Sequence, residues 1–91
     1  MNNDELVRFN PILAKALAEA QRLGFRIRQE WLGGMGGACV LRGQKWLFVD
    51  EALSPAEQLD VVLDALRDDP ALGLLPLDGE LARLLDWRKA A

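Results

Sequence analysis

The stretch that decides the fold is Gly33–Asp50, GGMGGACVLRGQKWLFVD, in which a glycine cluster precedes two apolar runs separated by a tight turn. Gly43 and Gln44 lie between the runs 38–42 and 45–50. Glycine at the first position of a two-residue loop suits a type II′ turn, where φ is positive. The stretch therefore predicts an antiparallel β-hairpin in which Arg42 faces Lys45.

Both faces of this hairpin are apolar, because side chains alternate across a strand. In the predicted register one face carries Cys39, Leu41, Trp46 and Phe48, and the other carries Ala38, Val40, Leu47 and Val49. An antiparallel sheet with one wet side shows polar residues there. Either helices and loops cover both faces, or one face meets another chain. We expect the core face to hold the large side chains Trp31, Trp46 and Phe48.

The segment before the hairpin predicts a helix and a strand. Asn10 and Pro11 are a strong helix start, and Gly24 is well placed to end a helix over residues 11–23. From Phe25 to Trp31 the apolar period changes to two, and the polar alternate face indicates an edge strand. Residues 1–9 are expected to form either a short helical turn or a frayed arm.

The segment after the hairpin predicts two more helices. Ser54–Glu57 matches a capping box with proline at the first helical position, and Pro70 ends the helix that follows. Residues 72–77 form an apolar loop that we expect to lie against the core, and Asp78 can cap a last helix. The predicted fold is α+β, a single small domain over residues 1–91. It is a three-stranded antiparallel meander with helices packed on it, in the order α-β-β-β-α-α.

Composition narrows the range of functions. The 91 residues include no histidine and one cysteine, and the net charge is −3. Without histidine the usual general bases, nucleophilic pairs and zinc sites are absent, so we expect no enzyme activity, no metal and no cofactor. Basic residues are scattered through an acidic chain, which disfavours nucleic acid as a partner. No run approaches a membrane span, and the N-terminus MNNDELVRF lacks the basic and apolar regions of a signal peptide, so we expect a cytoplasmic protein.

Two candidate sites follow from the residue pattern. The glycine loop of Gly33, Gly34, Gly36 and Gly37 could present N–H groups to an anion, or could be a plain connection between strands. The second is an acidic flank on the helix after Ser54, formed by Asp60, Asp64 and Asp68, which is either solvated or docks a basic partner. Cys39 is expected to act as a small buried apolar residue.

The segment from Lys45 to Asp68, with a strand ending WLFVD and a capped helix SPAEQLDVVLDAL, resembles the core of the minimal zinc metallopeptidases that cleave phage-type repressors. Where those enzymes have His-Glu-x-x-His, this chain has Leu63-Asp64-Ala65-Leu66-Arg67, so none of their catalytic residues carries over. The resemblance implies a metal-free relative that kept the scaffold. The whole chain also resembles small uncharacterised bacterial proteins with a GGxGGxC segment, which implies no activity.

These observations predict a non-enzymatic protein-interaction or structural module. Its expected partner is a protein, including a second copy bound through the hairpin or through residues 72–77. The alternative is a small-ligand or anion-binding domain that uses the loop Gly33–Gly37.

Overall fold

The computed structural model describes residues 10–34, 36–77 and 79–90, the last five of these by their backbone alone. The elements, in chain order, are α2 (Pro11–Arg22), β1 (Arg26–Glu30), β2 (Gly37–Leu41), β3 (Gln44–Asp50), α3 (Pro55–Asp68), the short 3-10 helix η1 (Leu72–Leu74) and α4 (Gly79–Ala90). The α+β class and the order α-β-β-β-α-α are confirmed. The expectations for residues 1–9 and for a cap at Asp78 lie outside the described residues.

Helices α2 and α3 begin where the capping residues predict. The Asn10 side-chain oxygen accepts hydrogen bonds from the N–H groups of Ile12 and Leu13, at 3.0 and 3.1 Å. At α3 both bonds of the capping box form, from Glu57 N–H to the Ser54 hydroxyl and from Ser54 N–H to the Glu57 carboxylate. Local chemistry therefore fixes both helix starts before any packing is considered.

The sheet is mixed, and the predicted antiparallel meander is wrong. The strand order is β1-β3-β2, with β1 parallel to β3 and β2 antiparallel to it. The connection from β1 to β2 therefore spans the end of β3, a distance of two strand spacings or about 10 Å. β3, the longest strand, thus takes the centre, while β1 lies at an edge as its polar face indicated.

The hairpin turn also differs from the prediction. Leu41 pairs with Gln44 and Cys39 with Trp46, so the loop is Arg42–Gly43. Both loop residues have positive φ, 52° and 79°, as a type I′ turn requires, whereas the type II′ turn at Gly43–Gln44 needs positive φ only once. The type I′ turn matches the right-handed twist of the strands, at the cost of holding one arginine at positive φ. The predicted partners shift by two positions, which leaves every side chain on its predicted face.

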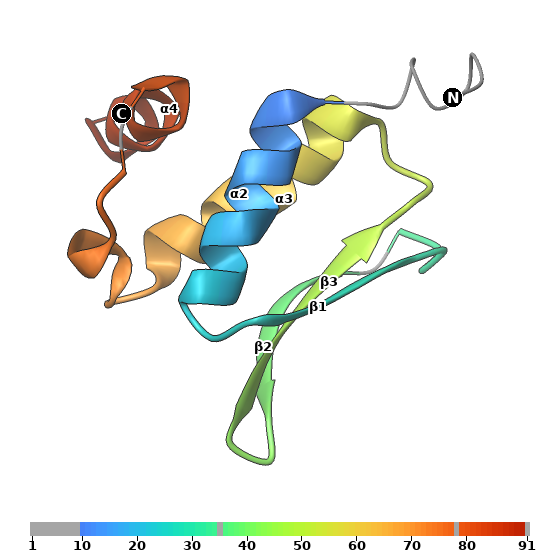
Figure 1. Cartoon of the computed structure of the whole chain (residues 1–91). Coiled ribbons are helices and arrows are strands. Elements are labelled where there is room, and N and C mark those ends of the chain that lie inside the picture. Colours follow the sequence, from blue (N-terminus) through green and yellow to red (C-terminus); the bar gives the residue numbers. More distant parts are fainter. Residues whose placement is uncertain (1–9, 35, 78, 91) are drawn as a thin grey trace.

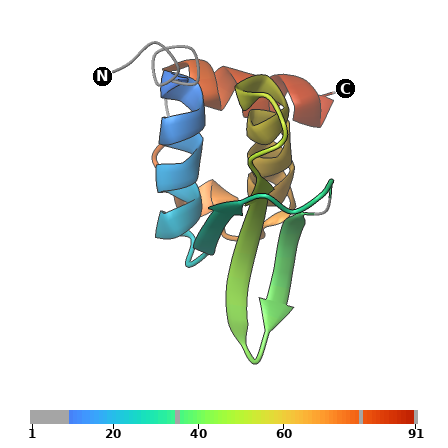
Figure 2. The ribbon, with the colours of Figure 1, turned by 90° about the vertical axis from the view of Figure 1, so that its right-hand side faces the viewer.

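Within the described part of the chain, Figures 1 and 2 show helices on only one side of the sheet. α2 and α3 lie side by side on this inner face, and α4 packs across them on the side away from the sheet. The tip of the β2–β3 hairpin extends beyond the helices (Figure 1). No helix in the described part of the chain is long and apolar enough to cross a membrane.

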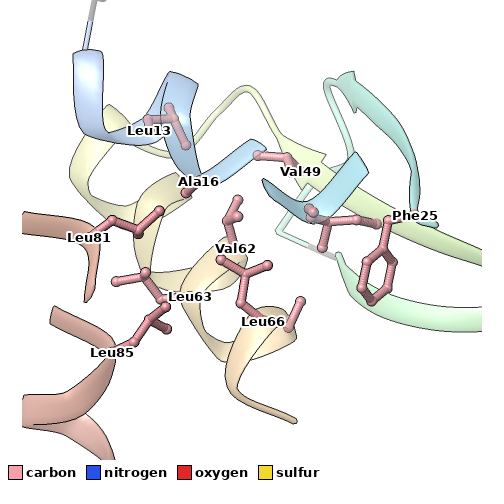
Figure 3. Close-up of a cluster of buried hydrophobic side chains, with 12 residues drawn as sticks. Leu13, Ala16, Phe25, Val49, Val62, Leu63, Leu66, Leu81 and Leu85 are labelled. Atoms are coloured by element: carbon pink, nitrogen blue, oxygen red, sulfur yellow. The ribbon is translucent and has the colours of Figure 1, made fainter. Parts of the chain in front are cut away.

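The core lies between the sheet and the helices. Leu47 and Val49 of β3 are fully buried against the helices, and Figure 3 shows Val49 with the α3 side chains Val62 and Leu66. On the other side of α3, Leu63 packs with Leu81 and Leu85 of α4. The apolar segment 72–77 packs partly against this cluster through Leu72 and Leu77.

The expectation that Trp31, Trp46 and Phe48 form the core face is wrong. Trp31 is 74% exposed, and Trp46 and Phe48 are half-buried on the outer face, which no described helix covers. The helices bear small and branched side chains toward the sheet, among them Ala16 and Ala20 at zero exposure, and these pack closely on leucine and valine. The Trp46 indole is left for the outer face, and Trp31 lies exposed beyond the end of β1.

Lys45 joins the ends of both inner helices to β3. Its ammonium donates to the Leu23 carbonyl at 2.5 Å and to the Asp69 carboxylate, and it lies 4.4 Å from the centre of the Phe25 ring. Burial raises the pKa of Asp69, but hydrogen bonds from Lys45 and the Ala71 N–H, with the charge of Lys45, more than offset this and leave that pKa lowered. Lys45 therefore serves the fold rather than an exposed basic patch.

Candidate functional site

The outer face of the sheet places arginines next to aromatic rings. Arg26 pairs with Trp46 and Arg28 with Phe48 in the parallel ladder between β1 and β3, so all four side chains share one face. The Arg26 guanidinium lies 5.8 Å from the Trp46 ring centre. Trp46 and Phe48 stack with their centroids 5.8 Å apart and an interplanar angle of 15°. We call these four residues the aromatic platform.

A shallow hollow adjoins the platform. It has a volume of about 320 Å³ and is lined by Leu32, Gly36, Gly37, Ala38, Cys39 and Phe48. Because two of these residues are glycines, backbone atoms form part of the surface of the hollow. Its volume is sufficient for one apolar side chain. Cys39 is half-buried here rather than fully buried as expected.

Asp50, at the end of β3, holds the glycine loop. Its side chain is buried, and its carboxylate accepts hydrogen bonds from the N–H groups of Gly34 at 2.6 Å, Ala52 at 2.9 Å and Leu32 at 3.1 Å. One N–H of the glycine loop, that of Gly34, therefore binds an anion, and that anion is the protein's own carboxylate. The N–H of Gly34 is consequently already engaged, although it belongs to the predicted ligand loop.

The pKa of Asp50 reflects this cradle. The hydrogen bonds from Ala52 and Leu32 lower it most, burial raises it by less, and the bond from Gly34 lowers it further. Each bond stabilises the ionised form, so Asp50 stays a carboxylate well into the acid range. It is an acceptor that orders the loop, and its lone pairs point at the backbone rather than at solvent.

Gly36 marks the closest approach of the loop to the sheet. A Cβ built there would lie 2.8 Å from the Phe48 carbonyl oxygen, a backbone atom that cannot rotate away. We expect Gly36→Ala to lower the free energy of unfolding by about 1–3 kcal/mol in a urea titration, because the loop or β3 must shift.

A matched control for Gly36→Ala is Gly73→Ala in η1. A Cβ there would meet nothing within 4 Å, so we expect almost no loss of stability. Equal stability of the two variants would show that the contact between the loop and β3 is not a constraint.

The acidic flank lies on α3 as predicted. Asp60, Asp64 and Asp68 are all exposed, and the Asp64 carboxylate accepts a hydrogen bond from the Arg67 guanidinium at 2.7 Å. An exposed pair one helical turn apart contributes little to stability. The three aspartates follow one side of a convex helix and do not converge on a cavity with the glycine loop. Docking of a basic partner on this flank stays a prediction.

The platform was not recognised from the sequence. Arg26 and Arg28 belong to the polar face that predicts an edge strand, and the aromatic residues are predicted to be core. What joins them is the parallel pairing of β1 with β3, which has no local signature. The role of Asp50 had a weak signal, since an acid ends an apolar strand and precedes an exposed turn.

No metal-binding cluster of three or more His, Cys, Asp or Glu side chains occurs among residues 10–34, 36–77 and 79–85. No protein family, curated protein or solved structure matches this chain. At the positions where the zinc peptidases have their motif, Leu63 is buried in the core and Arg67 bonds Asp64. The resemblance to those enzymes stays a prediction.

Proposed function

We propose that this chain is a non-enzymatic protein-interaction module that binds a protein partner on the aromatic platform. The observation that supports this most is that the helices cover only the inner face of the sheet, while the outer face carries the stacked Trp46–Phe48 pair. Partly exposed aromatic residues next to arginine are the side chains that dominate binding energy at protein interfaces.

The chemistry of the platform indicates the kind of segment that would bind. Arg26 and Arg28 favour carboxylates, and the hollow beside Phe48 favours one apolar side chain. Arg28 is partly engaged by Glu30 at 3.2 Å, an exposed pair that a stronger acceptor can displace. The proposed partner therefore presents an acidic segment with an apolar anchor.

Nucleic acid is the competing class of partner, because single strands stack on aromatic platforms flanked by arginine. A nucleic-acid strand is held along several successive phosphates by a basic groove, whereas the platform offers two arginines in a chain whose other basic residues are scattered. We propose neither a nucleic acid nor a membrane as a partner.

The alternative function, a small-ligand or anion site in the loop Gly33–Gly37, receives less support. Asp50 already occupies the N–H of Gly34, and an incoming anion would lie close to its carboxylate. An anion that stabilised the protein against heat, and stabilised the Asp50→Asn variant more because the competing charge is gone, would support this alternative over the platform.

The experiment is capture of the tagged protein from a lysate of its source cells, with and without nuclease, followed by identification of the bound proteins by mass. We expect a partner at about one to one that survives nuclease and is lost with Trp46→Ala or with Arg26→Glu/Arg28→Glu. The matched control is Leu74→Ala, which removes an 85% exposed leucine from η1, away from the sheet. Equal capture by Trp46→Ala and Leu74→Ala, or loss on nuclease treatment, would contradict the proposal.

A further inference from the structure

Strand β2 forms a sheet edge without the usual protection. Its sequence, GACVL, contains no charge and no proline, and Val40 and Leu41 are 66% and 53% exposed. Edge strands of natural proteins normally carry lysine, proline or a bulge that prevents pairing with another chain. The opposite edge, β1, does carry charges in its sequence RIRQE. The β2 edge is therefore open to pairing with a strand of another chain.

The backbone of β2 has free hydrogen-bonding groups at two positions. In a hairpin with a two-residue loop, the residues next to the loop pair by hydrogen bonds, which makes Leu41–Gln44 such a pair. Alternation along the strand then turns the N–H and C=O groups of Ala38 and Val40 away from β3. An incoming strand would bond to these two residues.

We infer that a second copy of this chain covers the β2 edge, with the two β2 strands antiparallel about a two-fold axis at Cys39. In this register Ala38 lies opposite Val40 of the second copy and forms the hydrogen-bonded pairs, and Cys39 lies opposite Cys39. The result is a continuous six-stranded sheet. Its outer face carries two aromatic platforms, and the helices of both copies lie on its inner face.

The strand complements itself in size and in charge. The same register places Leu41 opposite Gly37 and Arg42 beside Gly36 of the second copy, so each bulky residue meets a glycine. No two arginines face each other. An uncharged strand also pairs without the loss of solvation that a charged side chain at the strand–strand contact would suffer.

The inner side of the edge has room for the second copy. A mainly apolar hollow of about 520 Å³ lies beside β2, between it and the end of α3, and its lining includes Ala38, Val40, Ala65, Pro70 and Ala71. Val40 shares the helix-covered face with Leu47, since it pairs with Lys45, which lies two positions before Leu47 on β3. Val40 of the second copy would therefore enter this hollow and remove apolar surface from water.

The first test is the mass of the purified protein in solution, by light scattering across a dilution series. We expect twice the chain mass of 10.1 kDa for the natural protein, and a dimer at least about 10-fold weaker for Val40→Lys, which places a charge on the edge. Circular dichroism of Val40→Lys serves as the control that this variant is folded. A monomer at every concentration, or a dimer of unchanged strength in Val40→Lys, overturns the inference.

The second test locates the axis by cross-linking. Opposite Cys39 residues occupy a non-hydrogen-bonded pair, with Cα atoms about 4.5 Å apart, within the range of a disulfide. With diamide as the oxidant we expect rapid formation of a covalent dimer. In the control Cys39→Ala/Val40→Cys, the more exposed thiol lies off the axis and should cross-link at least about 10-fold more slowly. Equal rates would overturn the register.

The proposed dimer uses the β2 edge, whereas the proposed protein partner binds the outer face of the sheet. Each proposal can therefore be overturned without the other. The dimer tests use the purified protein alone, and we expect Trp46→Ala to remain a dimer. A monomer that still captures a protein partner through Trp46 overturns the inference and leaves the proposed function in place. A dimer that captures no protein partner overturns the proposed function and leaves the dimer inference in place.

Discussion

Replacing Leu47 by alanine should lower the free energy of unfolding by about 2–5 kcal/mol, the largest loss that we expect from any single substitution in the sheet. Leu47 is fully buried in the central strand, between β1 and β2 and under the helices. The neighbouring strands fix the backbone on both sides, so the cavity left by the missing atoms cannot easily collapse. A urea titration followed by circular dichroism measures the loss.

The matched control is the preceding residue. Trp46 is a larger side chain but lies half-buried on the outer face, so Trp46→Ala should cost about 1–2 kcal/mol, mainly through the stacking with Phe48. The order of the two losses decides which side of the sheet is the core. A larger loss for Trp46→Ala would place the core on the aromatic side, as the sequence alone suggested.

The helices could be predicted because their signals are local. Asn10 and the capping box at Ser54 satisfy N–H groups within three residues of themselves, and these bonds need no other part of the fold. The division of the hairpin into two faces was equally local, because it depends only on alternation. The assignment of side chains to the two faces is correct although the predicted turn type is wrong, because a shift of two positions in the strand pairing preserves the faces.

The order of the strands could not be predicted, because it depends on the loop over residues 31–36. Sequential strands usually pair, and four glycines give no preference for a short turn over a crossing. The crossing is accompanied by a contact with the buried Asp50 carboxylate at the end of β3, which accepts hydrogen bonds from the N–H groups of Leu32 and Gly34. That contact joins residues sixteen and eighteen positions apart.

The same crossing explains why the aromatic platform was missed. With β1 beside β3, Arg26 and Arg28 lie next to the two aromatic rings of β3. In a meander they would have lain beside β2 instead, and the basic residues would have had only small and aliphatic neighbours. Placement of the basic residues against aromatic ones is therefore a consequence of topology, and composition could not reveal it.

Asp50 should consequently control both the loop and the acid stability of the protein. We expect Asp50→Asn to lower the Tm by about 10 °C at pH 7, because the amide NH₂ would face backbone N–H groups that now donate to a carboxylate. Hydrogen exchange at the amides of Leu32, Gly34 and Ala52 should accelerate. The matched control is Glu51→Gln, the same change of charge at the adjacent exposed residue, which should leave the Tm nearly unchanged.

The pH dependence tests the same contact through its charge. Because folding lowers the pKa of Asp50, the stability it contributes is fully present above its unfolded pKa, about 4, and is lost as the pH falls through the lower folded value. The difference in Tm between the natural protein and Asp50→Asn should therefore be largest near neutral pH and narrow below about pH 4. A constant difference from pH 7 to pH 2 would show that the carboxylate is not ionised in its cradle. The loop would then be held by packing alone.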